Sequence, residues 1–401
     1  MQHVLVESAA DDLDFSPLHQ RMRWYIARGI LPGCSTLTLR GLDVVDFRCY
    51  GAMDIESARP LEPDTIFRLQ SSSKLITSVA ALMLVEAGRL RLDEPVATHL
   101  PEFAELRVLR PNATRPDDSE PARSPITVQQ LMTHTSGLSY GFLDPSSLID
   151  RIYADARVFE NVFYRRGTLE ELVHALARLP LAFQPGTAWR YSLATDVLSR
   201  AIEVASGQRF EEFLEQRIFQ PLGMHDTSFY IPEDKRHRLA TLYISKDGRH
   251  MPVDVPSLYF NPQALPSGGG GLASTMSDYA TLVRMLIAGG TWNNVRILRP
   301  ETIALMRAPQ LAVGMPIASP QWSMPNTSFG LGVAVKLAAQ DGEPLSAAGE
   351  YHWGGLAGTH WWIAPRANLA GICMSQRLES FLHPYSHDFK QLAYTIAAPR
   401  R

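Results

Sequence analysis

A serine and a lysine stand three residues apart in the sequence FRLQSSSKL, which spans residues 67–75. A serine hydroxyl is a weak nucleophile until a neighbouring group accepts its proton. A lysine amine can accept that proton if burial, a nearby positive charge or a helix N-terminus lowers its pKa. Because residues i and i+3 share a helix face, Ser71 and Lys74 would be neighbours in a helix. The pair is therefore a candidate for nucleophilic catalysis, although a polar helix start with a solvated lysine has the same sequence.

The elements around this pair would hold it in place. Ile66, Phe67 and Leu69 form an apolar, extended approach, and apolar residues then recur at helical spacing over residues 75–87. Gly88 follows at the position where a glycine commonly ends a helix. We therefore expect Ser71 at the mouth of a buried helix, where free backbone N–H groups suit a developing oxyanion.

A second serine lies in the segment GLSYG, residues 137–141, which matches the G-x-S-x-G nucleophile elbow. That motif requires a strand before the serine and a helix after it. Here a short helix with a capping box of Thr127 and Gln130 precedes the segment, and a loop follows it. We therefore interpret Ser139 as structural. His134, just before it, is expected to hold the loop rather than to take part in chemistry.

Metal and cofactor sites are not indicated. His383 and His387 stand four residues apart, but Pro384 intervenes and no H-E-x-x-H motif is present, so we expect a solvated helix start. The glycine run at residues 268–271 lacks the Lys-Ser/Thr of a phosphate-binding loop. Three widely spaced cysteines, Cys34, Cys49 and Cys373, favour free thiols over disulfides or a zinc site. We expect no metal and no organic cofactor.

Composition excludes several other classes of function. The chain has 401 residues and a net charge of −3, so nothing favours binding to nucleic acid or to an anionic membrane. No apolar run is long enough to span a membrane. Residues 1–7 have neither a basic start nor an apolar core, which argues against a secretory signal. We expect a cytoplasmic protein.

Strand patterns occupy both ends of the chain and helix patterns the middle. This order predicts an α+β fold with an antiparallel sheet built from both chain ends, flanking helices and a mostly helical insertion. We expect one catalytic domain over residues 1–401, with a sheet-containing part (1–70 and 325–401) and a mainly helical part (71–324). The expected strands are 35–40, 45–49, 329–337, 351–353, 359–363 and 369–374, and the expected helices include 15–29, 75–87, 168–179, 197–205, 210–218, 279–288 and 386–396.

Taken together, these motifs resemble the serine β-lactamase and penicillin-binding-protein superfamily over nearly the whole chain. The strongest likeness is to class C β-lactamases and to their relatives, the family VIII carboxylesterases, and a fungal acyltransferase that loads statin side chains is similar too. A β-lactamase-like fold is implied. The segments that carry the resemblance are 67–74, 131–138, 185–187 before Tyr191-Ser192, 221–224, 269–272 and 352–355.

The resemblance implies a role for each site residue. Ser71 is similar to the nucleophile and Lys74 to its activating amine, and Tyr191 stands where the family has the proton-shuttling tyrosine of Tyr-x-Asn. The backbone N–H groups of Ser71 and Leu356 would form the oxyanion hole. Alternatively, Tyr191 is a structural aromatic residue that packs on Trp189 where a helix begins.

Two departures from the family pattern bear on the substrate. Leu193 replaces the asparagine of Tyr-x-Asn, and Trp353-Gly354-Gly355 replaces the Lys-Thr-Gly strand motif. A tryptophan offers one N–H donor and no charge. We expect Trp353 to form an apolar wall, with a buried core tryptophan as the alternative. Gly354 and Gly355 would allow close backbone approach to a ligand.

These residues favour a serine carboxylesterase that forms an acyl-enzyme on Ser71 and could also transfer the acyl group to an alcohol. The alternatives are a β-lactamase or D-amino-acid peptidase or amidase, and a binding protein without catalysis. The expected partner is a small-molecule ester with a short acyl chain. The sequence leaves the physiological ester, the acceptor and the oligomeric state open.

Overall fold

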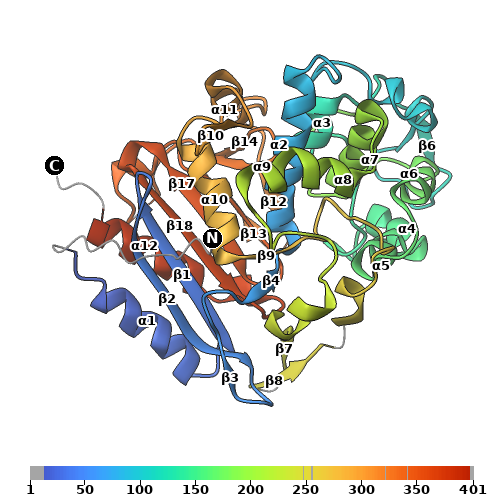
Figure 1. Cartoon of the computed structure of the whole chain (residues 1–401). Coiled ribbons are helices and arrows are strands. Elements are labelled where there is room, and N and C mark those ends of the chain that lie inside the picture. The colour runs from blue at the N-terminus through green and yellow to red at the C-terminus, as the bar shows by residue number, and fades with distance from the viewer. Residues whose placement is uncertain (1–12, 247, 254–255, 321, 341, 398–401) are drawn as a thin grey trace.

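A central antiparallel sheet joins the two ends of the chain (Figure 1). The computed structural model describes residues 13–246, 248–253, 256–320, 322–340 and 342–397. Residues 1–7, where we expect no secretion signal, lie outside this part. The sheet has the strand order β14-β15-β16-β17-β18-β1-β2-β3. Its strands are β1 (Gly33–Arg40), β2 (Asp43–Asp54), β3 (Arg59–Pro60), β14 (Thr327–Phe329), β15 (Ala334–Lys336), β16 (Tyr351–Gly354), β17 (Thr359–Ala364) and β18 (Leu369–Ser375).

The pairing of β1 with β18 brings residues more than 300 positions apart into register, with Cys34 opposite Ser375 and Arg40 opposite Leu369. The predicted sheet from both chain ends is therefore confirmed. The single-domain assignment for residues 1–401 stays a prediction. Cys34, Cys49 and Cys373 are free thiols, as predicted.

Helices cover both faces of the sheet, and the middle part of the sequence forms a mainly helical region beside it (Figure 1). On one face α1 and α12 pack together, burying Leu18, Tyr25 and Phe389. On the other face α10 and α2 belong to the larger core that continues into the helical region. No helix in the described ranges is both long and apolar enough to cross a membrane. The helices are α1 (Ser16–Ala27), α2 (Ser73–Glu86), α3 (Val128–Met132), α4 (Leu148–Asp155), α5 (Val158–Phe163), α6 (Leu169–Ala177), α7 (Ala194–Ser206), α8 (Phe210–Leu214), α9 (Gln220–Leu222), α10 (Met276–Ile287), α11 (Pro300–Met306) and α12 (Tyr385–Ala397).

One predicted strand was wrong. Residues 329–337 were expected to form a single strand, but they contain the end of β14, a turn and β15. Gly332 in the turn has φ +85°, and a Cβ atom there would collide with the Ser78 side chain on α2. The chain therefore turns where the glycine lets it pack directly against the helix that follows Ser71.

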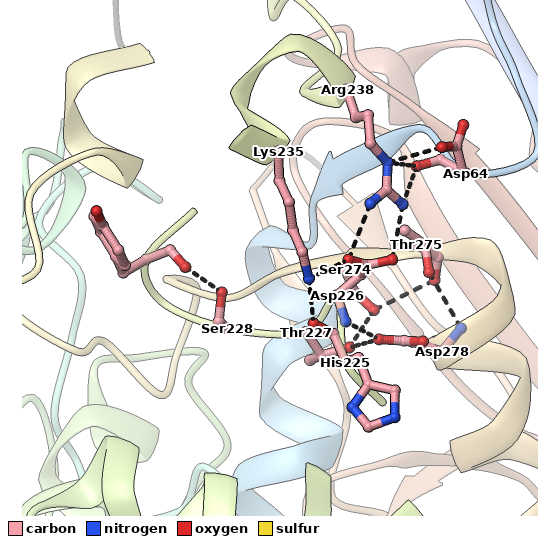
Figure 2. Close-up of polar contacts among 11 residues, drawn as sticks. Asp64, His225, Asp226, Thr227, Ser228, Lys235, Arg238, Ser274, Thr275 and Asp278 are labelled. Carbon is pink, nitrogen blue, oxygen red and sulfur yellow. Dashed lines mark hydrogen bonds and ion pairs between the residues drawn. The ribbon is translucent and has the colours of Figure 1, made fainter. Parts of the chain in front are cut away.

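A pair of short strands lies outside the main sheet, and the first of them leads into the segment that holds Ser71. β4 (Ile66–Arg68) pairs with β9 (Ala273–Thr275), and a bridge joins Ser228 to Ala273 of β9. Figure 2 shows the polar network beside this pair, in which Asp226 lies between Lys235 and Arg238. The network fixes the 225–238 segment against the start of α10, and so supports β9. The remaining strand pairs are β5 (Arg107–Leu109) with β6 (Ser119–Pro121), β7 (Tyr243–Lys246) with β8 (Arg249–Pro252), β10 (Thr291–Trp292) with β11 (Val295–Arg296), and β12 (Ala318–Ser319) with β13 (Trp322–Ser323).

Candidate active site

Ser71 and Lys74 are neighbours, as the i, i+3 spacing predicts. Ser71 lies in a single 3₁₀ turn, η1 (Gln70–Ser72), and Lys74 lies in the first turn of α2. Lys74 is only 2% exposed, and its Nζ donates a hydrogen bond to Ser71 Oγ at 3.2 Å. The solvated lysine that was the alternative interpretation is therefore wrong.

Lys74 has three hydrogen-bond acceptors. Besides Ser71 Oγ, its Nζ donates to the Tyr140 hydroxyl at 2.9 Å and to the Gly269 carbonyl at 2.6 Å. A protonated amine has three N–H groups, and each finds an acceptor here. A neutral amine has two, so it could donate to Tyr140 and Gly269 while its lone pair accepts the Ser71 proton. The same arrangement thus suits both charge states of the lysine.

Tyr140 is a site residue that the sequence analysis missed. It lies in the GLSYG segment next to Ser139, and no motif marks it. Burial, followed by the neighbouring Tyr191, raises the pKa of Tyr140 well above its usual value, so its hydroxyl stays neutral. Ser139 itself is buried, donates to Asp150 Oδ1 and accepts from Arg190 Nε, and no strand precedes it. It is a structural residue, as predicted.

Tyr191 lies between the lysine and the sheet. Its ring centroid is 4.8 Å from Lys74 Nζ, and its hydroxyl accepts a hydrogen bond from Trp353 Nε1 at 3.0 Å. Trp353 is thus both part of the expected apolar wall and a donor to the tyrosine oxygen. Trp189 also stacks on Tyr191, at 6.2 Å between ring centroids. Both interpretations of Tyr191 therefore apply, because the same ring packs on Trp189 and lies in the site.

His134 packs against Tyr191 and contacts the next residue, Ser192. Its ring lies 4.8 Å from the Tyr191 ring, and Nδ1 is 3.2 Å from Ser192 Oγ. Burial, and secondarily the charge of Lys74, holds the pKa of His134 well below its usual value, so the imidazole is neutral. These contacts agree with its expected role in holding the loop.

Asp196, on α7, holds the glycine-rich loop against Lys74, and the sequence analysis missed it as well. Its Oδ1 accepts hydrogen bonds from Ser267 Oγ at 2.5 Å and from the Gly269 N–H at 3.1 Å. The Gly269 carbonyl is therefore fixed where Lys74 needs an acceptor. A Cβ atom at residue 269 would collide with the Asp196 carboxylate, which explains the glycine. Burial raises the pKa of Asp196, while Lys74 and these donors oppose the rise.

The end of β16 lies against η1. A Cβ atom at Gly355 would collide with the Leu69 carbonyl and the Thr359 side chain, and one at Gly354 would collide with His360. Both glycines therefore allow close approach to the protein's own chain, and both also line the cavity, so that close approach to a ligand stays a prediction. The Leu356 N–H follows and has no backbone acceptor among the described residues.

A cavity of about 440 Å³ is lined by the predicted site residues other than Lys74. Its volume falls within the range of small-molecule sites. Ser71 lines the cavity and accepts the hydrogen bond from Lys74, and apolar side chains including Phe142, Phe159 and Trp322 also line it. No cluster of metal-binding side chains occurs in the described part of the chain. The cavity is lined by Ser71, Tyr140, Tyr191, Trp353, Gly354, Gly355 and Leu356, among others.

Comparisons with known proteins place this geometry in context. A family model described as Beta-lactamase matches residues 18–394. Esterase EstB of Burkholderia gladioli is 35% identical over 86% of this chain and 86% of its own length. Lovastatin esterase of Penicillium rubens is 35% identical over 78% of this chain and 80% of its own. The structure of EstCE1, a hydrolase with promiscuous acyltransferase activity, matches with a TM-score of 0.79 and 28% identity, over 94% of this chain and 97% of that chain.

Proposed function

The chain belongs to the β-lactamase family, and we propose that it is a serine carboxylesterase of the family VIII type, with acyl transfer to an alcohol as a second reaction. The observation that carries the proposal is the contact of 3.2 Å between Lys74 Nζ and Ser71 Oγ at the edge of an apolar cavity. Relatives that are esterases, and a structural neighbour that also transfers acyl groups, support the choice of ester over amide.

In the first half of the reaction, Lys74 takes the Ser71 proton as Oγ attacks the ester carbonyl. The tetrahedral oxyanion accepts hydrogen bonds from the N–H groups of Ser71 and Leu356. Tyr191 gives a proton to the leaving alcohol and recovers one from Lys74. The carbonyl–alkoxy bond breaks, and an acyl-enzyme on Ser71 remains.

In the second half, water or a second alcohol attacks the acyl-enzyme. Tyr191 accepts its proton while passing its own phenolic proton to Lys74, the bond to Ser71 Oγ breaks, and Lys74 delivers that proton to Oγ. The indole N–H of Trp353 stabilises the Tyr191 oxygen whenever it carries negative charge. The expected partner remains a small-molecule ester, with no cofactor.

The test is the hydrolysis of 4-nitrophenyl butyrate. We expect a burst followed by steady turnover, because acylation precedes deacylation, and the Ser71→Ala variant should lose both. Ser139→Ala is the matched control and should keep turnover, since Ser139 lies in a buried polar cluster outside the proposed mechanism. Unchanged hydrolysis in Ser71→Ala would refute the proposal. A kcat/KM for nitrocefin well above that for the ester would favour the β-lactamase alternative.

A further inference from the structure

Two buried arginines line the same cavity as Ser71. Arg68 is 2% exposed and Arg165 is 5% exposed, and both contribute to the cavity wall. The ring of Tyr259 lies beside both of them, 5.4 Å from the Arg68 guanidinium and 5.0 Å from that of Arg165. One lobe of the cavity therefore carries two positive charges around one tyrosine.

Among the residues that the structure describes, Arg68 donates only to neutral acceptors. Its NH1 donates to the Ala240 carbonyl at 2.6 Å and to Gln376 Oε1 at 3.3 Å. Its Nε–H has no acceptor among the described residues. Burial lowers the pKa of Arg68 to about 10, which still leaves the side chain charged at neutral pH. A charged group has thus been removed from water without a counter-ion.

Arg165 is likewise buried and donates its hydrogen bonds to neutral acceptors. Its Nε donates to the Leu265 carbonyl, and its NH1 donates to the carbonyls of Phe229 and Leu258. The carboxylate that acts on it electrostatically is that of Glu211, which forms an ion pair with Arg209 instead. Backbone carbonyls satisfy the N–H groups of Arg165 but do not neutralise its charge.

Two other cations that are wholly or partly removed from water, Lys336 and Lys390, are paired with carboxylates. Lys336, which is 3% exposed, lies 2.5 Å from Glu343, and Lys390, which also lines the cavity, lies 2.9 Å from Glu350. Desolvating a charge costs several kcal/mol unless an opposite charge compensates it. For Arg68 and Arg165 that cost is incurred when the protein folds, so an anion that enters the lobe meets cations that are already free of water.

We propose that Arg68 and Arg165 form a subsite for a carboxylate group of the substrate. The inference rests on the proposed function, because the carboxylate belongs to the molecule whose ester bond lies at Ser71. A guanidinium group presents a planar fork of donors that matches a carboxylate. The apolar side chains of Leu242 and Leu258 line the same cavity. The substrate class is therefore an ester with an apolar body and one anionic end.

Two substrate pairs test this inference and locate the charge. On the acyl side, 4-nitrophenyl hydrogen adipate is compared with 4-nitrophenyl methyl adipate. On the alcohol side, 4-carboxyphenyl butyrate is compared with its methyl ester. We expect kcat/KM to be at least tenfold higher for the anionic member of one pair. Ratios near 1 or below in both pairs would overturn the proposal.

Variants then assign the preference to the arginines. Arg68→Gln and Arg165→Gln should each move the anionic-to-neutral ratio of kcat/KM toward 1. Arg377→Gln is the matched control, because Arg377 is also buried, also donates to a carbonyl through NH1 and does not line the cavity. It should keep the wild-type ratio. A ratio that survives both Arg68→Gln and Arg165→Gln would also overturn the assignment.

A binding measurement separates this inference from the proposed reaction. Isothermal titration calorimetry of the Ser71→Ala variant with the same ester pairs reports affinity without turnover. We expect the Kd of one anionic ester to be at least tenfold lower than that of its methyl ester. If the wild type hydrolyses none of the esters, the proposed function fails, and this affinity ratio still decides the subsite: equal Kd values reject it.

Discussion

At the scale of single residues, the site depends on the three hydrogen-bond acceptors of the Lys74 amine. The amine contacts Ser71, Tyr140 and the Gly269 carbonyl, all within 3.2 Å. A proton can pass from Ser71 Oγ to Nζ with only a small shortening of the 3.2 Å contact. Such preorganisation lowers the barrier because no reorganisation is needed as charge develops.

Trp353 has a residue-scale role that can be measured. Trp353→Phe keeps an aromatic wall but removes the N–H that Tyr191 accepts. Hydrogen bonds to charged groups contribute about 1.5–3 kcal/mol. We therefore expect kcat/KM for 4-nitrophenyl butyrate to fall by roughly 10- to 100-fold.

The control for this variant is Trp189→Phe. Trp189 packs on Tyr191, but its indole N–H has no acceptor among the described residues, so phenylalanine removes no hydrogen bond. It should lose less than Trp353→Phe. Equal rates in Trp353→Phe and wild type would show that the indole N–H does not matter to the reaction.

At the scale of elements, a loop and a strand end are held against the first turn of α2. The glycine-rich loop is anchored to α7 by Asp196, and the end of β16 is anchored to η1 by Thr359, whose hydroxyl donates to the Leu69 carbonyl at 2.6 Å. These anchors decide where the Gly269 carbonyl and the Leu356 N–H lie. Both are backbone groups, which a side-chain substitution does not remove. A mutation can only shift them, by altering the residues that hold the loop or the strand end in place.

Asp196 allows a test of the loop. Asp196→Ala leaves the Ser267 hydroxyl and the Gly269 N–H without their acceptor, and each unmet buried group costs about 1–3 kcal/mol. The loop should shift and kcat should fall by roughly 10- to 100-fold, since the lysine loses a positioned acceptor. Asp196→Asn keeps an acceptor oxygen and should recover most of the activity. If Asn is as damaging as Ala, the charge of Asp196 matters more than the loop it holds.

At the scale of the whole molecule, stability should depend on pH through the network of Figure 2. Asp278 is 8% exposed and accepts hydrogen bonds from the Asp226 N–H and the Thr227 hydroxyl. Burial is the main cause that raises its pKa from 3.8 to about 6. The folded state therefore holds this proton more tightly than the unfolded chain does.

The sign of the effect follows from linkage. A raised folded-state pKa contributes stability below pH 3.8, and this contribution is lost as the pH rises through about 6. Asp278→Asn cannot lose a proton. Its free energy of unfolding relative to wild type should therefore increase by roughly 1–3 kcal/mol between pH 4 and pH 7, measured by urea denaturation.

Asp226 is the opposing control in that experiment. The cations Lys235 and Arg238 outweigh burial and lower its pKa, so it stabilises the fold as a carboxylate. Asp226→Asn should lose stability relative to wild type as the pH rises toward 3.8, and the difference should then stay constant between pH 4 and pH 7. The same pH trend in both variants would contradict this account of the network.

Local sequence patterns predicted much of this molecule. The predicted capping box of Thr127 with Gln130 is present, and α3 begins at it. The helix expected from residue 168 begins there as α6, which Thr168 and Glu171 cap. The neighbourhood of Ser71 and Lys74 was predictable because one turn of helix creates it. Alternating and helical patterns indicated the α+β arrangement, because each element must bury its apolar face.

The rest was decided only by the tertiary structure. The partners of Lys74 lie 66 residues away at Tyr140 and 195 residues away at Gly269. Nothing local in either segment marks it as a partner, since each contact exists only after the loop and α7 have packed around α2. The break between β14 and β15 and the unpaired charges of Arg68 and Arg165 have the same origin. Sequence spacing determined the nucleophile and its amine because they share one helical turn, whereas the groups that surround them depend on which distant backbones pack together.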